Sequence, residues 1–112
     1  MYHSDKQLFQ HILEEIYFLK KEVRVLTEAK FLDDDKSKRA FARSLEIIGE
    51  AVKNLSEEVV IEHSEIEWRK IAGMRDKLIH GYFSVNYKLV WDVAKNVIPN
   101  LERQLQNIIN EA

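Results

Sequence analysis

The sequence predicts an all-α protein: an up-and-down helical bundle of four long helices, the last of them broken near Pro99. Apolar residues recur at steps of three and four along most of the chain, which is the spacing of one helix face. Only three glycines and one proline interrupt the 112 residues. No segment has the alternating pattern and turn residues of a β-hairpin.

The first helix is predicted over residues 5–26. Ser4, with Gln7 three residues later, has the pattern of a capping box, in which each side chain satisfies a backbone N–H of the first turn. The apolar stripe of this helix consists of Leu8, Ile12, Ile16, Leu19, Val23 and Leu26.

A second helix is predicted after the three aspartates at 33–35, because acidic groups cap a helix start and suit its dipole. Its apolar stripe consists of Phe41, Leu45, Ile48, Val52 and Leu55. Gly49 lies inside this pattern and costs about 1 kcal/mol of helix stability relative to alanine. A close contact with another helix or subunit explains this glycine, and simple tolerance explains it equally well.

Residues 56–65 mix charged and apolar side chains and predict a connection in which the second helix frays. A third helix is predicted from about Glu67 to His80, where Gly81 stands in the position of a left-handed cap. We interpret Trp68 and Trp91 as packing residues.

Asn86 can cap a fourth helix, which contains Leu89, Val90 and Val93. Pro99 then either kinks this helix or opens a fifth helix in its first turn, which runs to about residue 110.

Composition predicts a single domain over residues 1–112. Hydrophobic residues make up 46% and charged residues 32%, which is typical of a globular chain and not of a disordered one. The absence of cysteine excludes disulfides and thiolate metal sites. No apolar run approaches the ~18 residues that span a bilayer. The first ten residues lack the order of a signal peptide, so we expect a cytoplasmic protein without membrane contact.

The net charge of −2 argues against a broad basic surface for long nucleic acid. A local basic site is still possible, since Arg69, Lys70, Arg75 and Lys77 fall within nine residues. The same run of cations also fits a solvated helix face.

The segment EWRKIAGMRDKLIHGYF, residues 67–83, carries the most specific chemistry. Arg75 can hold a phosphate in bidentate fashion, and His80, five residues later, can move a proton. Tyr82 follows within reach of both. This set predicts chemistry on a phosphodiester with Arg75 and His80 as catalytic residues, and without a metal or another cofactor.

Each of these residues also has a purely structural interpretation. His80 can cap a helix, Arg75 can pair with Asp76 or Glu67, and Tyr82 can pack in the core. Arginine–histidine pairs at this spacing also arise by chance in a chain with six arginines and four histidines. Positions five apart point about 140° away from each other on a helix, so a site shared by two copies of the chain is one way to unite the pair.

Other polar residues offer less. Arg43, Glu46 and Glu50 lie on one polar face of the second predicted helix, where they pair at the surface or line a site. The remaining histidines have no metal-ligand spacing and receive no role: His3, His11 and His63.

The chain resembles a HEPN domain of the HepT toxin type over nearly its whole length. The resemblance rests on RSLEIIGEAVKNLS (43–56), WRKIAGMRDKLIHGYF (68–83) and LVWDVAKNVIPNLERQL (89–105). Within it stands the pattern Arg-x4-His-x-Tyr, formed here by Arg75, His80 and Tyr82.

The resemblance implies a toxin–antitoxin system and a metal-independent endoribonuclease that acts on RNA as a homodimer, with two Arg-His motifs in one cleft. It also implies a minimal nucleotidyltransferase as the antitoxin, which adenylylates the motif tyrosine, here Tyr82. The competing hypothesis is a non-catalytic helical module that dimerises and docks the nucleotidyltransferase or nucleic acid.

Overall fold

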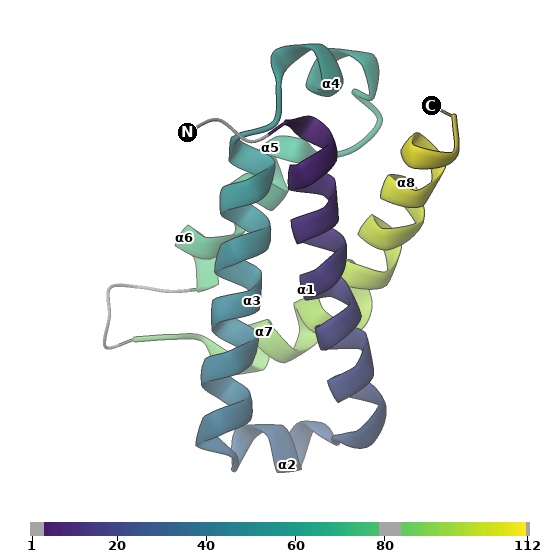
Figure 1. Cartoon of the computed structure of the whole chain (residues 1–112). Helices are drawn as coiled ribbons and strands as arrows, with labels where there is room; N and C mark the ends of the chain where they lie inside the picture. The colour runs from purple at the N-terminus through teal and green to yellow at the C-terminus, as the bar shows by residue number, and fades with distance from the viewer. Residues whose placement is uncertain (1–3, 79–83, 112) are drawn as a thin grey trace.

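A computed structural model describes residues 4–78 and 84–111, and residues 1–3, 79–83 and 112 lie outside the described part. The described chain is helical throughout its regular structure, so the all-α prediction is confirmed. Figure 1 shows the elements in order, which are α1 (Asp5–Val25), α2 (Glu28–Leu32), α3 (Asp35–Lys53), α4 (Glu57–Glu62), α5 (Trp68–Ala72), α6 (Met74–Leu78), α7 (Tyr87–Asp92), η1 (Val93–Val97) and α8 (Ile98–Glu111).

Helices α1 and α3 form an antiparallel pair along the length of the molecule (Figure 1). Ser4 starts α1 with the predicted capping box, which includes the hydrogen bond from the Gln7 backbone N–H to the Ser4 hydroxyl. Asp34 starts α3, and the Ser37 hydroxyl and the Lys36 backbone lower the pKa of its carboxyl group. The predicted stripes are buried at Leu8, Ile12, Ile16 and Leu19 of α1 and at Phe41, Leu45, Ile48 and Val52 of α3.

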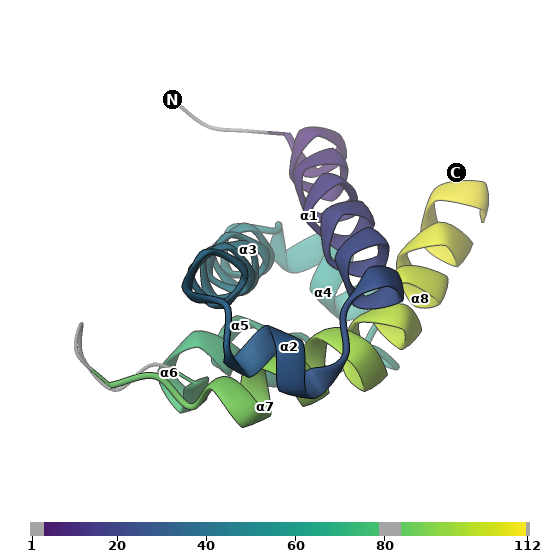
Figure 2. The same ribbon diagram turned by 90° about the horizontal axis from the view of Figure 1, so that it is seen from below.

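Two short helices were not predicted. Helix α2 crosses below the lower ends of α1 and α3 (Figure 2), capped by the Thr27 hydroxyl. Helix α4 occupies part of residues 56–65, where the prediction of a plain connection is wrong. Ser56, the N-cap residue of α4, donates its backbone N–H and its hydroxyl to the Asp5 carboxylate of α1, at 2.9 and 2.7 Å. Helix α4 buries none of its residues, so its sequence carries no apolar stripe by which to recognise it.

The third predicted helix is wrong in its continuity. Instead of one helix from Glu67, the structure has the short helices α5 and α6, separated at Gly73. Gly73 ends α5 by donating its N–H to the carbonyl of Arg69 at 3.0 Å. Glycine loses more backbone freedom on folding than any other residue and weakens a helix interior, which favours a break there. The prediction of four long helices is therefore corrected, and the predicted end at His80 and Gly81 lies outside the described residues.

Residues 87–111 form one uninterrupted helical run. The Asn86 side chain caps it as predicted, accepting from the Leu89 N–H at 3.1 Å. Pro99 lies in the first turn of α8, one of its two predicted positions, and the preceding η1 is a π-helix. In η1 the Ile98 N–H reaches back five residues to the Val93 carbonyl. Because proline has no N–H to donate, a wider turn just before it keeps the run continuous.

Aromatic side chains join these elements in the core. The Phe31 ring of α2 lies 4.6 Å from that of Phe41 and 5.2 Å from that of Trp91, measured between centroids. Trp68 is buried and donates its indole N–H to the His63 carbonyl at 2.9 Å. The interpretation of both tryptophans as packing residues is confirmed. None of the helices in the described part of the chain is both long and apolar enough to cross a bilayer.

Gly49 lies where α3 meets the backbone of α5. A Cβ atom at this position would stand 3.4 Å from the carbonyl oxygens of both Ile71 and Ala72. A close approach of α3 and α5 at Gly49 is thus present, with room for a methyl group at ordinary contact distance.

Candidate active site

Arg75 is the candidate catalytic residue that the structure describes. It lies on α6, a helix anchored by Met74 and Leu78, whose side chains are both buried. The Arg75 side chain points away from that anchor and is 51% exposed. It can therefore meet a ligand in solvent while its helix is fixed by the core.

Two carboxylates contact the Arg75 guanidinium. Its Nε lies 3.4 Å from Glu46 Oε2 on α3, and its Nη1 lies 3.4 Å from Asp76 Oδ1. The predicted pairing with Asp76 is confirmed. Glu67 instead pairs with Lys70 at 2.6 Å and raises the pKa of that lysine. Charge-assisted hydrogen bonds of arginine are usually about 2.7–2.9 Å long, so the two contacts of Arg75 are weak enough for a phosphate to replace.

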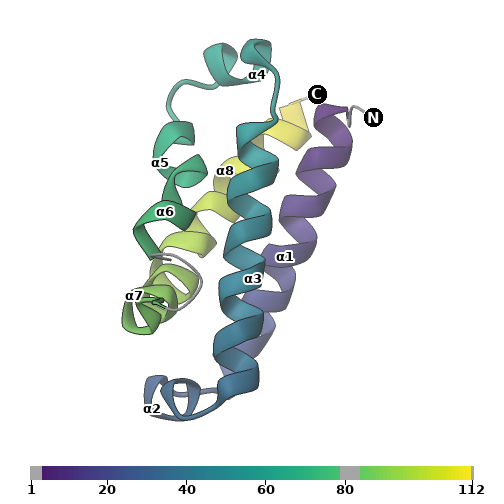
Figure 3. The same ribbon diagram turned by 90° about the vertical axis from the view of Figure 1, so that its left-hand side faces the viewer.

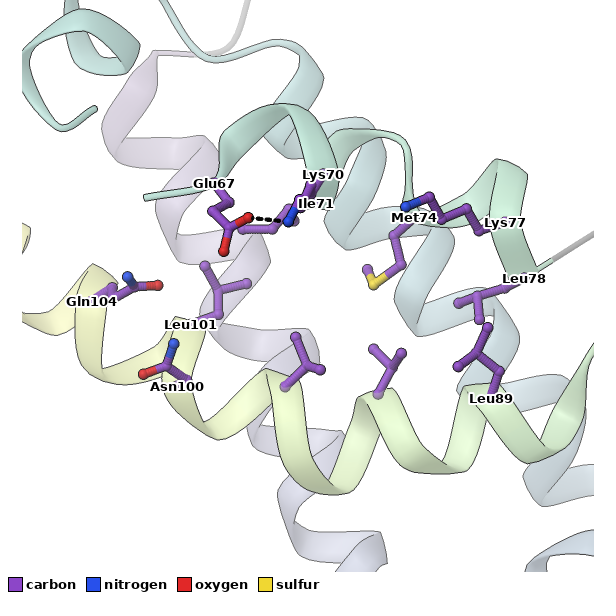
Figure 4. A pocket seen from close by; sticks show the side chains of 12 residues that line it. Glu67, Lys70, Ile71, Met74, Lys77, Leu78, Leu89, Asn100, Leu101 and Gln104 are labelled. Atoms are coloured by element: carbon purple, nitrogen blue, oxygen red, sulfur yellow. Dashed lines mark ion pairs between the residues drawn. The ribbon is translucent and has the colours of Figure 1, made fainter. Parts of the chain in front are cut away.

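The four clustered cations do not share one face of the molecule, and Arg69 lines a hollow beside Ile66 and Trp68. Arg75 faces α3, whereas Lys70 and Lys77 line a hollow of about 350 Å³ between α5–α6 and the run from α7 to α8. Figure 4 shows that hollow, with apolar side chains such as Met74 and Leu101 along its walls. These cations therefore do not form a single basic patch. Arg75 lies on the side of α6 that faces α3.

Beside Arg75 lies a second cavity of about 370 Å³. Helix α3 supplies most of it and stands between α6 and α1, as Figure 3 shows. The lining consists of Leu8 and His11 from α1, Arg43, Glu46, Ile47, Glu50, Ala51 and Asn54 from α3 with its C-cap, and Arg75 from α6. We call it the α3 cavity.

The structure thus brings Arg43, Glu46 and Glu50 to the same cavity as Arg75. Within the described part of the chain, Arg43 and Glu50 make no side-chain hydrogen bond or ion pair. The Asn54 amide donates to the Glu50 backbone carbonyl at 2.8 Å. The cavity accordingly offers a guanidinium, a carboxylate and an amide oxygen to a ligand.

His11 is a lining residue that the sequence did not reveal as such. It is half-buried on α1, one turn after Leu8. A histidine beside an apolar stripe looks like any residue at the edge of a core. Only the packing of α1 against α3 brings it next to Arg43 and Arg75.

His80 and Tyr82, the other candidate residues of the motif, lie outside the described residues. The described chain on either side of them is joined by a hydrogen bond, in which the Asn86 N–H donates to the Leu78 carbonyl at 2.8 Å. Only one residue separates Leu78 from His80 in the sequence. Among residues 4–78 and 84–111, no group of three or more His, Asp or Glu side chains is placed to hold a metal ion.

The helical fold thus places an exposed arginine beside a polar cavity. Sequence comparison identifies the family of the chain. The family model described as "Ribonuclease HepT-like" matches residues 12–108. The chain belongs to this HepT-like ribonuclease family of the HEPN superfamily.

Several relatives share most of the chain. "Putative RNase TTE0752" of Caldanaerobacter subterraneus subsp. tengcongensis is 50% identical over 108 residues, which cover 96% of each chain. "Probable ribonuclease HepT" of Thermococcus cleftensis is 40% identical over 108 residues, covering 96% of this chain and 98% of the relative. "Putative RNase MJ0127" of Methanocaldococcus jannaschii is 44% identical over 86 residues, covering 77% of this chain and 71% of the relative. No solved structure matches the chain.

Proposed function

We propose that this protein is a metal-independent endoribonuclease that acts on RNA as a homodimer. The supporting observation is Arg75, half exposed on a core-anchored helix and held only by long contacts to two carboxylates. An arginine in this state can exchange its carboxylates for a phosphodiester. Membership of a ribonuclease family supports RNA as the source of that phosphodiester.

In the proposed reaction the 2′-hydroxyl oxygen of a ribose attacks the adjacent phosphorus. The new O–P bond forms as the bond to the 5′-oxygen breaks, which leaves a 2′,3′-cyclic phosphate and a free 5′-hydroxyl. One His80 removes the proton from the 2′-hydroxyl, and His80 of the second copy donates a proton to the leaving 5′-oxygen. The two Arg75 guanidiniums hold the phosphate oxygens and stabilise their extra charge in the transition state.

We further propose that this ribonuclease is the toxin of a toxin–antitoxin pair. Its antitoxin is a minimal nucleotidyltransferase that adenylylates Tyr82. An adenylyl group adds bulk and negative charge two residues from His80, and both oppose the entry of RNA. Residues 1–112 form a single HEPN-like domain in this proposal, and the protein works in the cytoplasm.

The test is the digestion of total RNA by purified protein in the presence of a chelator, with a folded His80→Ala variant beside it. The mass of Tyr82-containing peptides is checked first, so that only unmodified protein is assayed. We expect the wild type alone to release fragments with cyclic-phosphate and 5′-hydroxyl ends. Cleavage by both proteins would remove His80 from the mechanism.

An absence of cleavage by both proteins would favour the non-catalytic binding module. Expression without the antitoxin then separates the two hypotheses in cells. Growth arrest that His80→Ala abolishes, at equal protein level and with the fold intact, supports the ribonuclease. Growth arrest that is unchanged in the variant supports a protein that acts only by binding.

A further inference from the structure

The α3 cavity is larger than the phosphate contact of Arg75 requires. We propose that it is a subsite for one unpaired RNA nucleotide, in which Glu50 selects the base. The inference rests on the proposed ribonuclease function and names a part of its substrate. Guanine is the base that the lining of this cavity fits best.

The size and floor of the cavity suit a nucleotide. Its volume of about 370 Å³ is near the lower end of the ~300–1,000 Å³ typical of small-molecule sites. Leu8, Ile47 and Ala51 form the apolar floor of the cavity, and half-buried Ile47 leaves surface on which the face of a base can lie. Proteins that read RNA commonly hold an unpaired base in this way, with its edge hydrogen-bonded by polar side chains.

The polar groups around this floor are rich in hydrogen-bond acceptors. Glu50 is exposed, and its carboxylate has no partner among the described residues. Asn54 uses its amide nitrogen on the Glu50 carbonyl, so its amide oxygen is left to accept. Guanine offers two neighbouring donors, N1–H and the N2 amino group, to the two oxygens of one carboxylate. Uracil offers a single N–H between two carbonyl oxygens, which a carboxylate repels.

The cations of the cavity place the phosphates around this base. Arg75 stands at the edge of the cavity, where the scissile phosphate belongs in the proposed reaction. Arg43 lies on the same face of α3, one turn before Glu46, and has no ion pair within the described residues. It can hold a neighbouring phosphate without regard to sequence. In the free protein Glu46 contacts Arg75 at 3.4 Å, whereas Glu50 has no ion pair to lose among the described residues, so we assign the base to Glu50.

The test uses four oligonucleotides that differ only in one unpaired nucleotide: G, A, C or U. Cleavage by the full chain is measured as kcat/KM, and binding is measured separately with the same sequences carrying 2′-O-methyl ribose, which cannot undergo 2′-hydroxyl attack. The variant is Glu50→Gln, which keeps the size of the side chain but places an N–H2 group among the acceptors. Glu58→Gln is the matched control, because Glu58 is exposed on α4 away from the α3 cavity.

For the wild type and Glu58→Gln we expect G to exceed U by about tenfold or more in both cleavage and binding, the range of one bidentate base contact. Glu50→Gln should abolish this preference, so that cleavage and binding of the G substrate fall by about tenfold or more towards those of the U substrate. Equal use of all four bases, or a preference that Glu50→Gln leaves intact, would overturn the subsite and leave the ribonuclease standing.

A preference for G in binding without any cleavage would support the subsite and count against the ribonuclease. Arg43→Gln gives an independent readout: weaker binding of all four sequences by a similar factor, with a smaller dependence on salt. A loss confined to one base would contradict the phosphate role of Arg43.

Discussion

At the scale of single residues, the charge of Arg75 is balanced before any substrate arrives. Glu46 and Asp76 each lie 3.4 Å from a guanidinium nitrogen, and exposed pairs of this kind contribute only about 0–1 kcal/mol. A phosphate can therefore displace these two carboxylates at little cost in free energy. Until it does so, they orient the exposed Arg75 side chain. It also agrees with the net charge of −2, since the cavity carries carboxylates as well as cations.

At the same scale, the role proposed for Tyr82 can be tested by a single substitution. Replacing Tyr82 by phenylalanine removes the hydroxyl at which we propose adenylylation and leaves the aromatic ring. We expect Tyr82→Phe to cleave RNA within about threefold of the wild-type rate, because the phenol has no proton-transfer role in the proposed reaction. The nucleotidyltransferase with ATP should inhibit RNA cleavage by the wild type and leave cleavage by this variant unchanged. Intact mass should show an added adenylyl group on the wild type alone.

An antitoxin that silences Tyr82→Phe as well as the wild type would contradict adenylylation as the mode of control. Occlusion of the site by the bound partner would then be the better explanation. A nucleotidyltransferase variant without catalytic activity distinguishes the two, because occlusion does not need ATP.

At the scale of elements, the contact between α3 and α5 determines where α6 and Arg75 lie. Gly49 lets the two backbones approach, since a Cβ there would stand 3.4 Å from two carbonyl oxygens of α5. That distance is ordinary for one methyl group and too short for a branched side chain. Helix α6 follows α5 after the single residue Gly73. A shift of α5 would therefore move α6 as well and disturb the contact between Arg75 and Glu46.

We therefore expect opposite results from two substitutions at Gly49. Gly49→Ala should be tolerated and can gain up to about 1 kcal/mol, the helix-propensity difference between these residues. Gly49→Leu should lose about 1–3 kcal/mol through overpacking and should lower RNA cleavage as well. Urea unfolding measures the stabilities, and equal stability of the two variants would show that the α3–α5 contact is not tight.

At the scale of the whole molecule, the proposed reaction needs two copies of the chain. One cleft would hold both His80 side chains, one as base and one as acid. A dimer that carries a single His80 lacks one of the two proton-transfer groups, so it should be nearly inactive. This sets the proposal apart from a ribonuclease in which each copy works alone.

Mixed dimers test this arrangement. Co-expression of equal amounts of wild type and His80→Ala leaves about a quarter of the dimers with two His80, if the copies pair at random. We expect the specific activity to fall to about that quarter of the wild-type value. A fall to only about one half, which simple dilution of wild type with buffer also gives, would mean that each copy is independent.

Local patterns in the sequence were enough for the helical class and for the main helix starts. Ser4 with Gln7, Asp34 and Asn86 act as caps because a cap involves only the first turn of its own helix. The apolar stripes of α1 and α3 were readable for the same reason, since each is a property of one helix. Arg75 was found from its motif, and its contact with Asp76 is between neighbours in the chain.

What the tertiary structure decided depends on residues far apart in the sequence. The break at Gly73 and the short helices α2 and α4 are set by packing that no single apolar stripe shows. The α3 cavity brings together Leu8, Glu46 and Arg75, which are separated by 38 and 29 residues in the chain. The sequence by itself determined the helical class, the apolar stripes of α1 and α3 and the reactive residue types, because those rest on short-range interactions. The cavity that Arg75 and Glu50 both line required the packing of α1, α3 and α6 against one another, because its walls come from three different helices.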